Sequence, residues 1–447
     1  MTELHTTSED DLMLMGTVVT GFEDSSRNEV KKQLPNCSLC ENFFSQQQKL
    51  QGRILFKTPR NVETKNKLMQ LWSLEKLYVV CGSYTIPGLS TTSNNEVTDK
   101  IKAHNIELVT NAVRSVDWNL SFSAWRELYC TFNDIQQTPD VIKWRVTVRR
   151  AGVHYFKTEE ITIACVNSIN LEIPGNTFDV SLKDYQLEIF IYIFFDTVFV
   201  CLTACDDSLC LRRIQQRQDI LNGTSLRPSI AYNMASMAQI QPGEVVLDLC
   251  CGTGTLPVVI SQLCSSNIVL GVDLDLDQLQ RSMKNFEASN VSTLNPPDVL
   301  LSDFGALPFK SNSVDVIISN LPFGKQIGTH SQNKKIYPAL FSEVARVLTQ
   351  TGRVIFLTTE TRLISQCVKN NKQFLWLRDR TSVCVGGLDA WVHVICKKSQ
   401  RSLEKWRIGG ERIKRVTEIR EKLRREEDLN RLKQESNSSD NDINSTE

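Results

Sequence analysis

The chain has 447 residues, which is enough for more than one folded domain. Its 51 Lys and Arg residues balance its 51 Asp and Glu residues, so the formal net charge is zero and a globally basic nucleic-acid-binding surface is excluded, although local basic patches are not. A composition of 41% hydrophobic and 23% charged residues is typical of a globular protein. The 14 cysteines show no disulfide spacing, and we interpret them as reduced thiols of an intracellular protein.

The start of the chain and its longest apolar stretch bear on membrane association. Residues 1–11 are polar and acidic, unlike a targeting segment. The apolar stretch 187–205 contains Glu188 and Asp196, charges that a membrane helix would not carry near its middle. Its β-branched and aromatic residues favour two adjacent strands joined at Phe195 and Asp196. We therefore expect a soluble protein without a membrane span.

The first half of the chain mixes short apolar strands with polar connections. Between the first two strands, a short helix is expected that Pro35 ends. From Val141 the pattern becomes strongly strand-like, because residues 143–150 alternate apolar and basic side chains. A basic segment follows the apolar hairpin. These segments are strands at 13–20, 53–56 and 77–82, a helix at 23–34, and the basic segment at 211–217.

Residues 223–398 alternate short apolar runs with helical segments, which is typical of a parallel sheet covered on both faces. The segments 381–386 and 390–396 flank Gly387 and predict an antiparallel hairpin at the edge of that sheet. After Lys398 the sequence predicts a charged, solvated helix and a disordered tail. The expected strands are 245–250, 268–274, 299–303, 314–322 and 353–359, and the expected helices are 256–264, 276–288, 335–349 and 361–370.

A glycine-containing turn follows the first strand of this parallel sheet. Gly252 and Gly254 let a ligand approach the backbone and let the next helix start tightly. The dinucleotide and P-loop patterns are both absent, and Asp248 before the turn would repel a pyrophosphate. A cationic cofactor without a phosphate suits this turn better. Asp273 ends the second strand, where it can accept bonds from ribose hydroxyls, and Asp303 ends the third strand, near an adenine amino group.

The fourth strand runs into the sequence Asn320-Leu-Pro-Phe323-Gly. A simple turn would explain the Asn, Pro and Gly but not the aromatic residue. An exocyclic amine on a planar ring is a poor nucleophile, because its lone pair is delocalised. The Asn320 side-chain oxygen and the Pro322 carbonyl could accept its N–H groups, while Phe323 stacks on the ring. His330, just beyond the loop, is a weaker candidate for a substrate contact.

These motifs together resemble a class I methyltransferase whose cofactor is S-adenosylmethionine. Asn320-Leu-Pro-Phe323 is similar to the N/D-x-P-F/Y/W motif of amino-group N-methyltransferases. The resemblance implies that Asn320, Pro322 and Phe323 are catalytic. It also implies cofactor binding by Asp248, Cys250, Gly252, Gly254, Asp273 and Asp303. We expect no metal site, because Cys37 and Cys40 form a lone C-x-x-C pair without further ligands.

The first half of the chain resembles RNA-binding modules. Residues 143–152, 187–191 and 208–213 are similar to strands and the basic end of a THUMP domain, and residues 16–30 to the start of the ferredoxin-like domain that accompanies it. The whole chain thereby resembles the THUMP domain-containing RNA guanine-N2-methyltransferases. The resemblance predicts an α/β protein with a C-terminal class I (Rossmann-like) methyltransferase domain preceded by α+β ferredoxin-like and THUMP domains. The RNA-binding residues would be Arg149, Arg150, Arg212, Arg213 and Arg217.

The resemblance implies methylation of the N2 amine of a guanosine in tRNA, in the cytoplasm or alternatively the nucleus. It also implies a small zinc-containing methyltransferase activator subunit as a partner, covering an apolar edge of the catalytic domain. Two alternatives remain: methylation of another planar amine, such as adenine N6 or a protein glutamine, and an RNA-binding protein with a retired catalytic fold. The expected parts are a ferredoxin-like region at 13–140, a THUMP domain at 141–222, a methyltransferase domain at 223–398 and a charged tail at 399–447.

Overall fold

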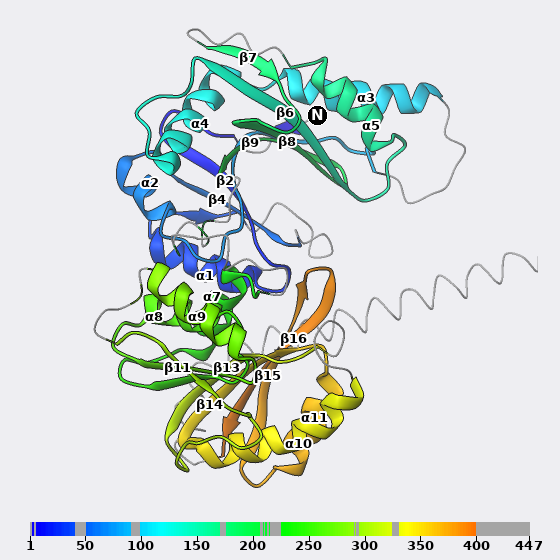
Figure 1. The fold of residues 1–447 in the computed structure, drawn as a ribbon. Coiled ribbons are helices and arrows are strands. Elements are labelled where there is room, and N and C mark those ends of the chain that lie inside the picture. Colours follow the sequence, from blue (N-terminus) through cyan, green and yellow to red (C-terminus); the bar gives the residue numbers. More distant parts are fainter. Residues whose placement is uncertain are drawn as a thin grey trace, which may run out of the picture.

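The computed structural model describes residues 2–3, 6–40, 51–90, 99–169, 176–205, 209, 211, 214, 225–289, 291, 295–323 and 330–398. The tail expected over 399–447 and the basic residues Arg212, Arg213 and Arg217 lie outside the described residues. The N-terminal half forms a nine-stranded sheet and the C-terminal half a seven-stranded sheet, stacked along the length of the molecule (Figure 1).

The N-terminal sheet combines two groups of strands that pair into one continuous surface, in the order β3-β4-β2-β5-β9-β8-β6-β7, with β1 paired to β5. Its elements are β1 (Thr2–Glu3), β2 (Asp11–Thr17), α1 (Glu23–Gln33), β3 (Ser38–Leu39), β4 (Arg53–Pro59), α2 (Val62–Leu68), β5 (Leu77–Thr85), α3 (Asp99–Arg114), α4 (Trp118–Asn133), β6 (Val141–Ala151), α5 (Thr158–Val166), β7 (Thr177–Val180), β8 (Leu187–Phe194) and β9 (Thr197–Cys205).

The first group of strands has the β-α-β-β-α-β order of a ferredoxin-like arrangement. Strand β2 lies between β4 and β5 and is antiparallel to both, while β3 pairs with the outer side of β4. The expected apolar hairpin is present: β8 and β9 are antiparallel and joined by Phe195 and Asp196, with Phe195 in a left-handed conformation at φ 51°. Backbone pairing of β5 with β9 then joins the first group of strands to the second.

Helices α3 and α4 were not expected from the sequence. Both helices contact β5, which precedes them, and β9, which follows; the Trp125 indole N–H, for example, donates to the Thr203 carbonyl of β9 at 2.9 Å. Helix α3 also contacts α5, and helix α4 also contacts α2. The domain boundary expected at residue 140 stays a prediction from the sequence.

The two faces of the nine-stranded sheet are covered differently. One apolar cluster joins the inward side chains of the strands to residues of each described helix from α1 to α5, such as Val30 of α1 and Trp125 of α4. The cluster on the opposite face, which includes Met13, Tyr78 and Phe190, draws its described members from strands and their connections alone. Because successive strand residues point to opposite faces, this second face carries its own set of side chains, largely aromatic.

The C-terminal sheet has the order β12-β11-β10-β13-β14-β16-β15, and its first five strands are parallel. The hairpin expected around Gly387 is present as β15 and β16 at the other edge. Its elements are α7 (Pro228–Ala238), β10 (Val245–Asp248), α8 (Thr255–Leu263), β11 (Ile268–Asp273), α9 (Leu276–Ala288), β12 (Asp298–Leu301), β13 (Val314–Asn320), α10 (His330–Val347), β14 (Leu348–Thr358), α11 (Thr361–Asn370), β15 (Leu375–Val385) and β16 (Leu388–Lys397).

Helices cover both faces of this sheet, as the continuous apolar strands predict. Residues of α7, α8 and α9 pack on one face and residues of α10 and α11 on the other. The strand order reverses between β10 and β13, and ligands of open α/β sheets bind at such a reversal, beyond the carboxyl ends of the strands. Among the described helices, none has the length and apolar character needed to cross a bilayer.

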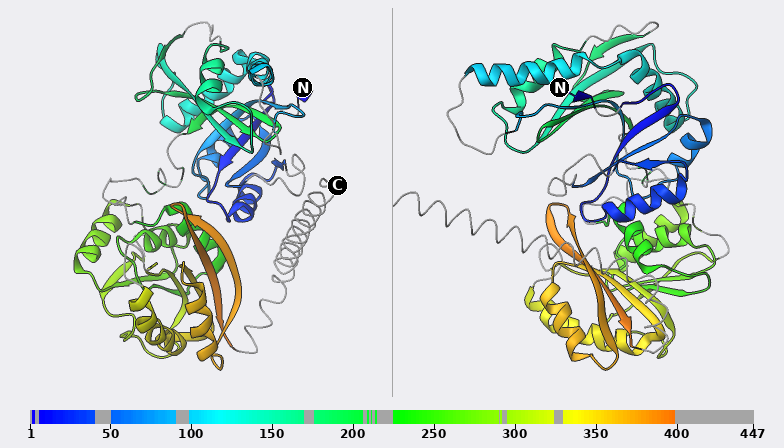
Figure 2. Two further views of the ribbon diagram at one scale, coloured as in Figure 1. Left: turned by 90° about the vertical axis from the view of Figure 1, so that its right-hand side faces the viewer. Right: turned by 180° about the vertical axis from the view of Figure 1, so that it is seen from behind.

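The two halves contact each other through the loop after β2 and the β15–β16 hairpin, which extends toward the N-terminal half (Figure 2). The Cys384 backbone N–H donates to the Thr20 carbonyl at 3.0 Å. Phe22 belongs to the same apolar cluster as Met234 and Val383 of the C-terminal half. This shared cluster fixes how the two halves are oriented.

Candidate functional site

The turn after β10 is shaped by two glycines in the left-handed region, Gly252 at φ 52° and Gly254 at φ 84°. A Cβ on Gly252 would meet no atom within 4 Å, so the turn leaves open space above this residue. A Cβ on Gly254 would lie 2.6 Å from Cε1 of Phe286 on α9, which explains the need for glycine there. The turn thus combines tight packing behind it with room for a ligand in front.

Asp248 and Asp273 flank this turn. Asp273 accepts hydrogen bonds from the Gly252 and Asp275 backbone N–H groups at 2.8 and 3.0 Å, and Asp248 accepts one from Cys250 at 3.2 Å. Asp248 is only 3% exposed, and burial, together with the charge of Asp273, raises its pKa to about 7. Neither carboxylate forms an ion pair with a described residue. The pair therefore leaves negative charge that a cation could balance.

Cys250 and Asp303 are the remaining residues predicted to contact the cofactor. Burial raises the pKa of the Cys250 thiol, so it stays protonated beside the two carboxylates. Asp303 lies beyond the end of β12 and is exposed, and its carboxylate accepts the Gly305 N–H at 2.7 Å. Because β11 and β12 are neighbours, the structure brings Asp303 to the same edge of the sheet as Asp273. Their contacts with a cofactor remain predictions.

Asn320 ends β13 across the strand reversal from this turn. Its side-chain oxygen Oδ1 is buried and has no hydrogen-bond partner among the described residues. The following loop is tied down at several points: the Leu321 N–H donates to the Leu357 carbonyl at 3.0 Å, and the Thr359 hydroxyl donates to the Phe323 carbonyl at 3.0 Å. A buried amide oxygen without a donor is costly, and it is free to accept a hydrogen bond from a bound ligand.

The Pro322 carbonyl already has partners in the protein. It accepts hydrogen bonds from Asn333 Nδ2 at 3.0 Å and from the Tyr337 hydroxyl at 3.2 Å, both from α10. Glu360, which follows β14, accepts from Asn333 at 3.3 Å and contacts Nδ1 of His330 at 2.8 Å. The sequence did not single out Asn333, Tyr337 or Glu360. No local motif marks them, because Asn333 and Tyr337 lie on α10 and Glu360 follows β14, away from the loop in the sequence.

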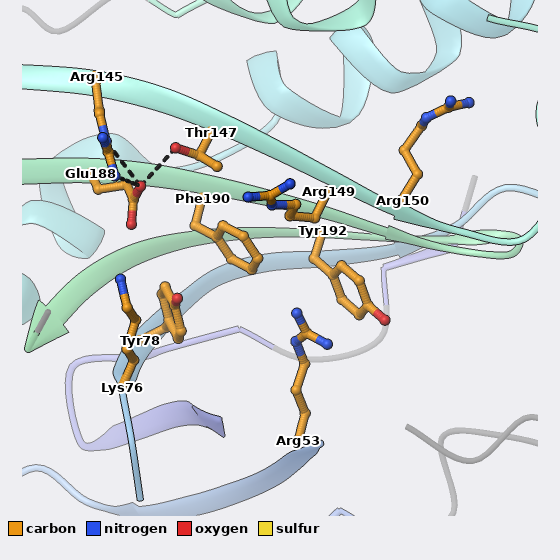
Figure 3. A pocket seen from close by; sticks show the side chains of 10 residues that line it. All are labelled: Arg53, Lys76, Tyr78, Arg145, Thr147, Arg149, Arg150, Glu188, Phe190 and Tyr192. Carbon is orange, nitrogen blue, oxygen red and sulfur yellow. Dashed lines mark hydrogen bonds and ion pairs between the residues drawn. The ribbon is translucent and has the colours of Figure 1, made fainter. Parts of the chain in front are cut away.

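A cavity of about 440 Å³ lies on the face of the nine-stranded sheet whose apolar cluster contains no described helix (Figure 3). Its aromatic floor includes Tyr78 stacked on Phe190, with ring centroids 4.8 Å apart. The Arg53 guanidinium lies 4.0 Å from the ring centroid of Tyr192, and its Nε is buried without a partner among the described residues. The cavity is lined by Arg53, Lys76, Tyr78, Arg145, Thr147, Arg149, Arg150, Glu188, Phe190 and Tyr192.

The cavity is lined by more basic side chains than acidic ones. Its single carboxylate, Glu188, is already hydrogen-bonded within the protein. Glu188 accepts hydrogen bonds from Arg145 Nη2 and from the Thr147 hydroxyl, each at 2.6 Å. Arg149 is exposed and forms no hydrogen bond or ion pair with a described residue. Excess positive charge suits a nucleic-acid backbone. The rings of Tyr78, Phe190 and Tyr192 are buried and form the floor beneath these cations.

The structure separates the two adjacent arginines predicted to bind RNA. The Arg149 guanidinium points into the cavity, whereas the Arg150 side chain turns away from it (Figure 3). Arg150 donates to the Phe156 carbonyl at 2.6 Å and to the Thr158 hydroxyl at 3.1 Å. Sequence reasoning missed Arg53 and Lys76, which come from strands far earlier in the chain.

Comparisons with known proteins agree with these features. Residues 215–382 match the family described as RMKL-like, methyltransferase domain. The chain is 28% identical over 285 residues to the human tRNA (guanine(6)-N(2))-methyltransferase THUMP3, covering 61% of this chain and 55% of that protein. It is 31% identical over 195 residues to the human U6 snRNA (guanine-N(2))-methyltransferase THUMPD2, covering 43% and 36%. The chain thus spans about half or less of the length of these curated relatives.

Among solved structures, TrmN from Thermus thermophilus superposes with a TM-score of 0.65 at 21% identity, covering 87% of this chain and all of that one. This likeness shows the fold. The expected α/β architecture with a C-terminal Rossmann-like methyltransferase fold is confirmed, as is the resemblance to proteins named for guanine-N2 methylation.

Proposed function

We propose that this protein transfers a methyl group from S-adenosylmethionine to the exocyclic N2 amine of a guanosine in tRNA. The observation that carries the proposal is the Asn320 side-chain oxygen, which is buried and without a donor among the described residues at the strand reversal. An amide oxygen accepts the N–H of an amine. Placed beside the open turn at Gly252, it can hold an acceptor amine close to a bound cofactor.

The residues around the turn fit S-adenosylmethionine. Gly252 leaves room at the backbone, Asp273 would accept bonds from ribose hydroxyls, and Asp248 adds negative charge that favours a cationic ligand over a pyrophosphate. Bound S-adenosylmethionine supplies a methyl group that is already activated by the sulfonium. The protein therefore needs to bind and orient more than to activate. Cys250, Gly254 and Asp303 complete the proposed set of cofactor-binding residues.

The proposed acceptor site consists of Asn320, Pro322 and Phe323. Asn320 accepts an amine N–H, the Pro322 carbonyl orients the second N–H, and Phe323 stacks on the base. Both curated relatives are named for guanine-N2 methylation, although the RNAs in their names differ. Their names therefore support the choice of the N2 atom more strongly than the choice of tRNA.

The cavity on the nine-stranded sheet is the proposed docking site for RNA. Its Arg and Lys side chains suit phosphates, and the buried rings of Tyr78, Phe190 and Tyr192 support them from below. We place Arg149 among the contacting residues. Arg212, Arg213 and Arg217, outside the described residues, keep the role that the resemblance predicts. The expected ferredoxin-like, THUMP and methyltransferase domains are part of this proposal.

The proposed zinc-containing activator subunit would bind along β12. This strand is the outermost described strand of the C-terminal sheet, so one side of its backbone pairs with no described strand. Leucines at or near this edge are exposed: Leu274 by 64%, Leu276 by 53%, Leu300 by 42% and Leu301 by 54%. Exposed apolar side chains beside a free strand edge favour a protein partner. We further propose a cytoplasmic location, with the nucleus as the alternative.

The test is a methyl-transfer assay on total small RNA with labelled S-adenosylmethionine, using the full chain co-expressed with the activator subunit. We expect labelled N2-methylguanosine, lost in Asn320→Ala but kept in Asn111→Ala, a control on the exposed face of α3. Labelled N6-methyladenosine or methylglutamine would replace the proposed acceptor by another planar amine. Absence of cofactor binding would support a retired catalytic fold instead.

A further inference from the structure

The carbonyl of Pro322 carries the inference, because both of its lone pairs are in use. Asn333 Nδ2 donates at 3.0 Å and the Tyr337 hydroxyl at 3.2 Å. A carbonyl oxygen has two lone pairs. Under the proposed function this carbonyl also orients an amine of the acceptor base. One of its two protein partners must then give way when the acceptor binds.

Glu360 holds the Asn333 side chain in place. Its amide nitrogen faces both the Pro322 carbonyl and Oε1 of Glu360, at 3.0 and 3.3 Å. Both neighbours are acceptors, so the nitrogen must point at them, and the oxygen Oδ1 is left without a partner among the described residues. Glu360 is itself held by His330, whose Nδ1 lies 2.8 Å from both carboxylate oxygens. Asn333 is therefore the fixed partner of the carbonyl.

Tyr337 has a second place for its proton. Its hydroxyl lies 3.1 Å from Oγ1 of Thr358, the last residue of β14. The Tyr337 side chain is fully buried, and burial raises its pKa, so the hydroxyl keeps its proton and must donate it. Turning the O–H from Pro322 to Thr358 requires rotation about one bond and no movement of the ring. Tyr337 is therefore the exchangeable partner.

We propose that Asn333 and Tyr337 are positioning residues with different tasks: Asn333 aims the Pro322 carbonyl, and Tyr337 occupies its second lone pair until the acceptor amine arrives, then donates to Thr358. The inference rests on the proposed function. It assigns to Thr358 the role of an alternative acceptor that frees the carbonyl. Before the acceptor binds, the loop already has the conformation that the acceptor needs. The Tyr337 hydroxyl keeps the Pro322 carbonyl hydrogen-bonded in the meantime, so no buried acceptor is left unpaired.

A double-mutant cycle tests this assignment through Tyr337→Phe, Thr358→Val and their combination. Tyr337→Phe frees the lone pair and keeps the ring, so we expect kcat to stay within about threefold of the unaltered protein. Thr358→Val removes the alternative acceptor and leaves the hydroxyl on Pro322. We expect kcat/KM for RNA to fall about tenfold, and adding Tyr337→Phe to restore it, because the competing hydroxyl is gone.

Asn333→Leu supplies the contrast, because it keeps the branched shape at Cγ and removes the donor. We expect kcat to fall at least about tenfold while the dissociation constant for S-adenosylmethionine stays unchanged. Thermal melting of every variant identifies loss of folding; if Asn333→Leu does not fold, the Tyr337 and Thr358 cycle decides alone. The inference is overturned if Tyr337→Phe does not rescue Thr358→Val, or if it loses as much kcat as Asn333→Leu. An unaltered chain that binds the cofactor but methylates no RNA would instead refute the proposed function.

Discussion

Asp248 illustrates, at the scale of one residue, a conflict between stability and binding. The carboxyl group is 3% exposed, and its pKa is raised from 3.8 to about 7, mainly by burial. Between these values the folded protein binds more protons than the unfolded chain. The free energy of unfolding therefore falls as the pH rises from about 4 to about 7. A buried charge that weakens the fold is consistent with a role in holding a cationic ligand.

The variant Asp248→Asn should melt at a higher temperature than the unaltered protein at pH 8, because it removes the cost of the buried charge. The difference should shrink as the pH is lowered toward 5, where the native carboxyl is protonated. The same variant should bind S-adenosylmethionine more weakly at pH 8. Thermal melts across this pH range and calorimetric titration measure both effects. Asp303→Asn, at an exposed carboxylate, is the control for the melting curves only, because Asp303 belongs to the proposed cofactor-binding set. Parallel melting curves for Asp248→Asn and the unaltered protein would contradict the assignment.

The residues near the proposed acceptor site divide into those that sequence can reveal and those that it cannot. Asn320, Pro322 and Phe323 are contiguous and follow an apolar strand, so their pattern is visible along the chain. Asn333 and Tyr337 contact the same loop from α10, and Glu360, which follows β14, contacts Asn333. In sequence they look like ordinary polar residues of a helix and a strand end. Only the packing of α10 against β14 brings them together.

At the scale of elements, the alternation of side chains along β6 decides which basic residues can act together. Arg145, Thr147 and Arg149 share the face that lines the cavity, whereas Arg150 bonds to residues that follow the strand. The strand itself was predictable from its alternating pattern. Which face of β6 lines the cavity was not predictable, because that depends on the pairing with β8 and on the helices that cover the other side of the sheet.

Replacing Arg149 by Ala should weaken RNA binding and lower its dependence on salt by about one phosphate contact. Arg150→Ala should change RNA affinity much less, because its guanidinium is bound to Phe156 and Thr158. Fluorescence anisotropy with labelled tRNA at several salt concentrations measures both. Both arginines line the cavity, so equal losses of affinity would contradict only the difference expected between Arg149 and the hydrogen-bonded Arg150.

Helices α3 and α4 show why part of the fold escapes sequence reasoning. The buried residues Val109, Val113 and Trp125 are spaced among many polar side chains, and no proline or glycine marks the start of either helix. The strands of the C-terminal sheet were predictable because they are buried on both faces and therefore continuously apolar. The pairing of β5 with β9 is non-local and has no signature in either strand.

At the scale of the whole molecule, one of the contacts between the two halves depends on a glycine. Gly21 has φ 100°, and a Cβ there would lie 2.0 Å from the Ser382 carbonyl oxygen on the hairpin. Glu23 fixes the same loop by accepting the Gly21 and Gly52 backbone N–H groups, each at 2.8 Å. The loop and the hairpin therefore fit only when residue 21 has no side chain.

The variant Gly21→Ala should separate the hairpin from the loop and lower RNA methylation while cofactor binding persists. Gly88→Ala is a matched control, because Gly88 also has a positive φ, 81°, but a Cβ there meets no atom within 4 Å. The control should lose only about 1–2 kcal/mol of stability, which is the backbone strain that an alanine introduces at a positive φ. Methyl-transfer rates, cofactor titration and thermal melts compare the two. Equal methylation by both variants would mean that the contact does not couple the halves.

The continuous nine-stranded sheet determines which strands contribute basic residues to the proposed RNA-docking cavity. Arg53 and Lys76 reach the cavity from the first group of strands and Arg149 from the second, across the paired strands β5 and β9. Neither group of strands forms the proposed docking site alone. Each supplies part of its positive charge, and the pairing of β5 with β9 brings the two parts together. A fragment carrying only one group would present an incomplete set of cations. The proposed recognition of RNA would thus be a composite property that arises when the two groups of strands fold as a single surface.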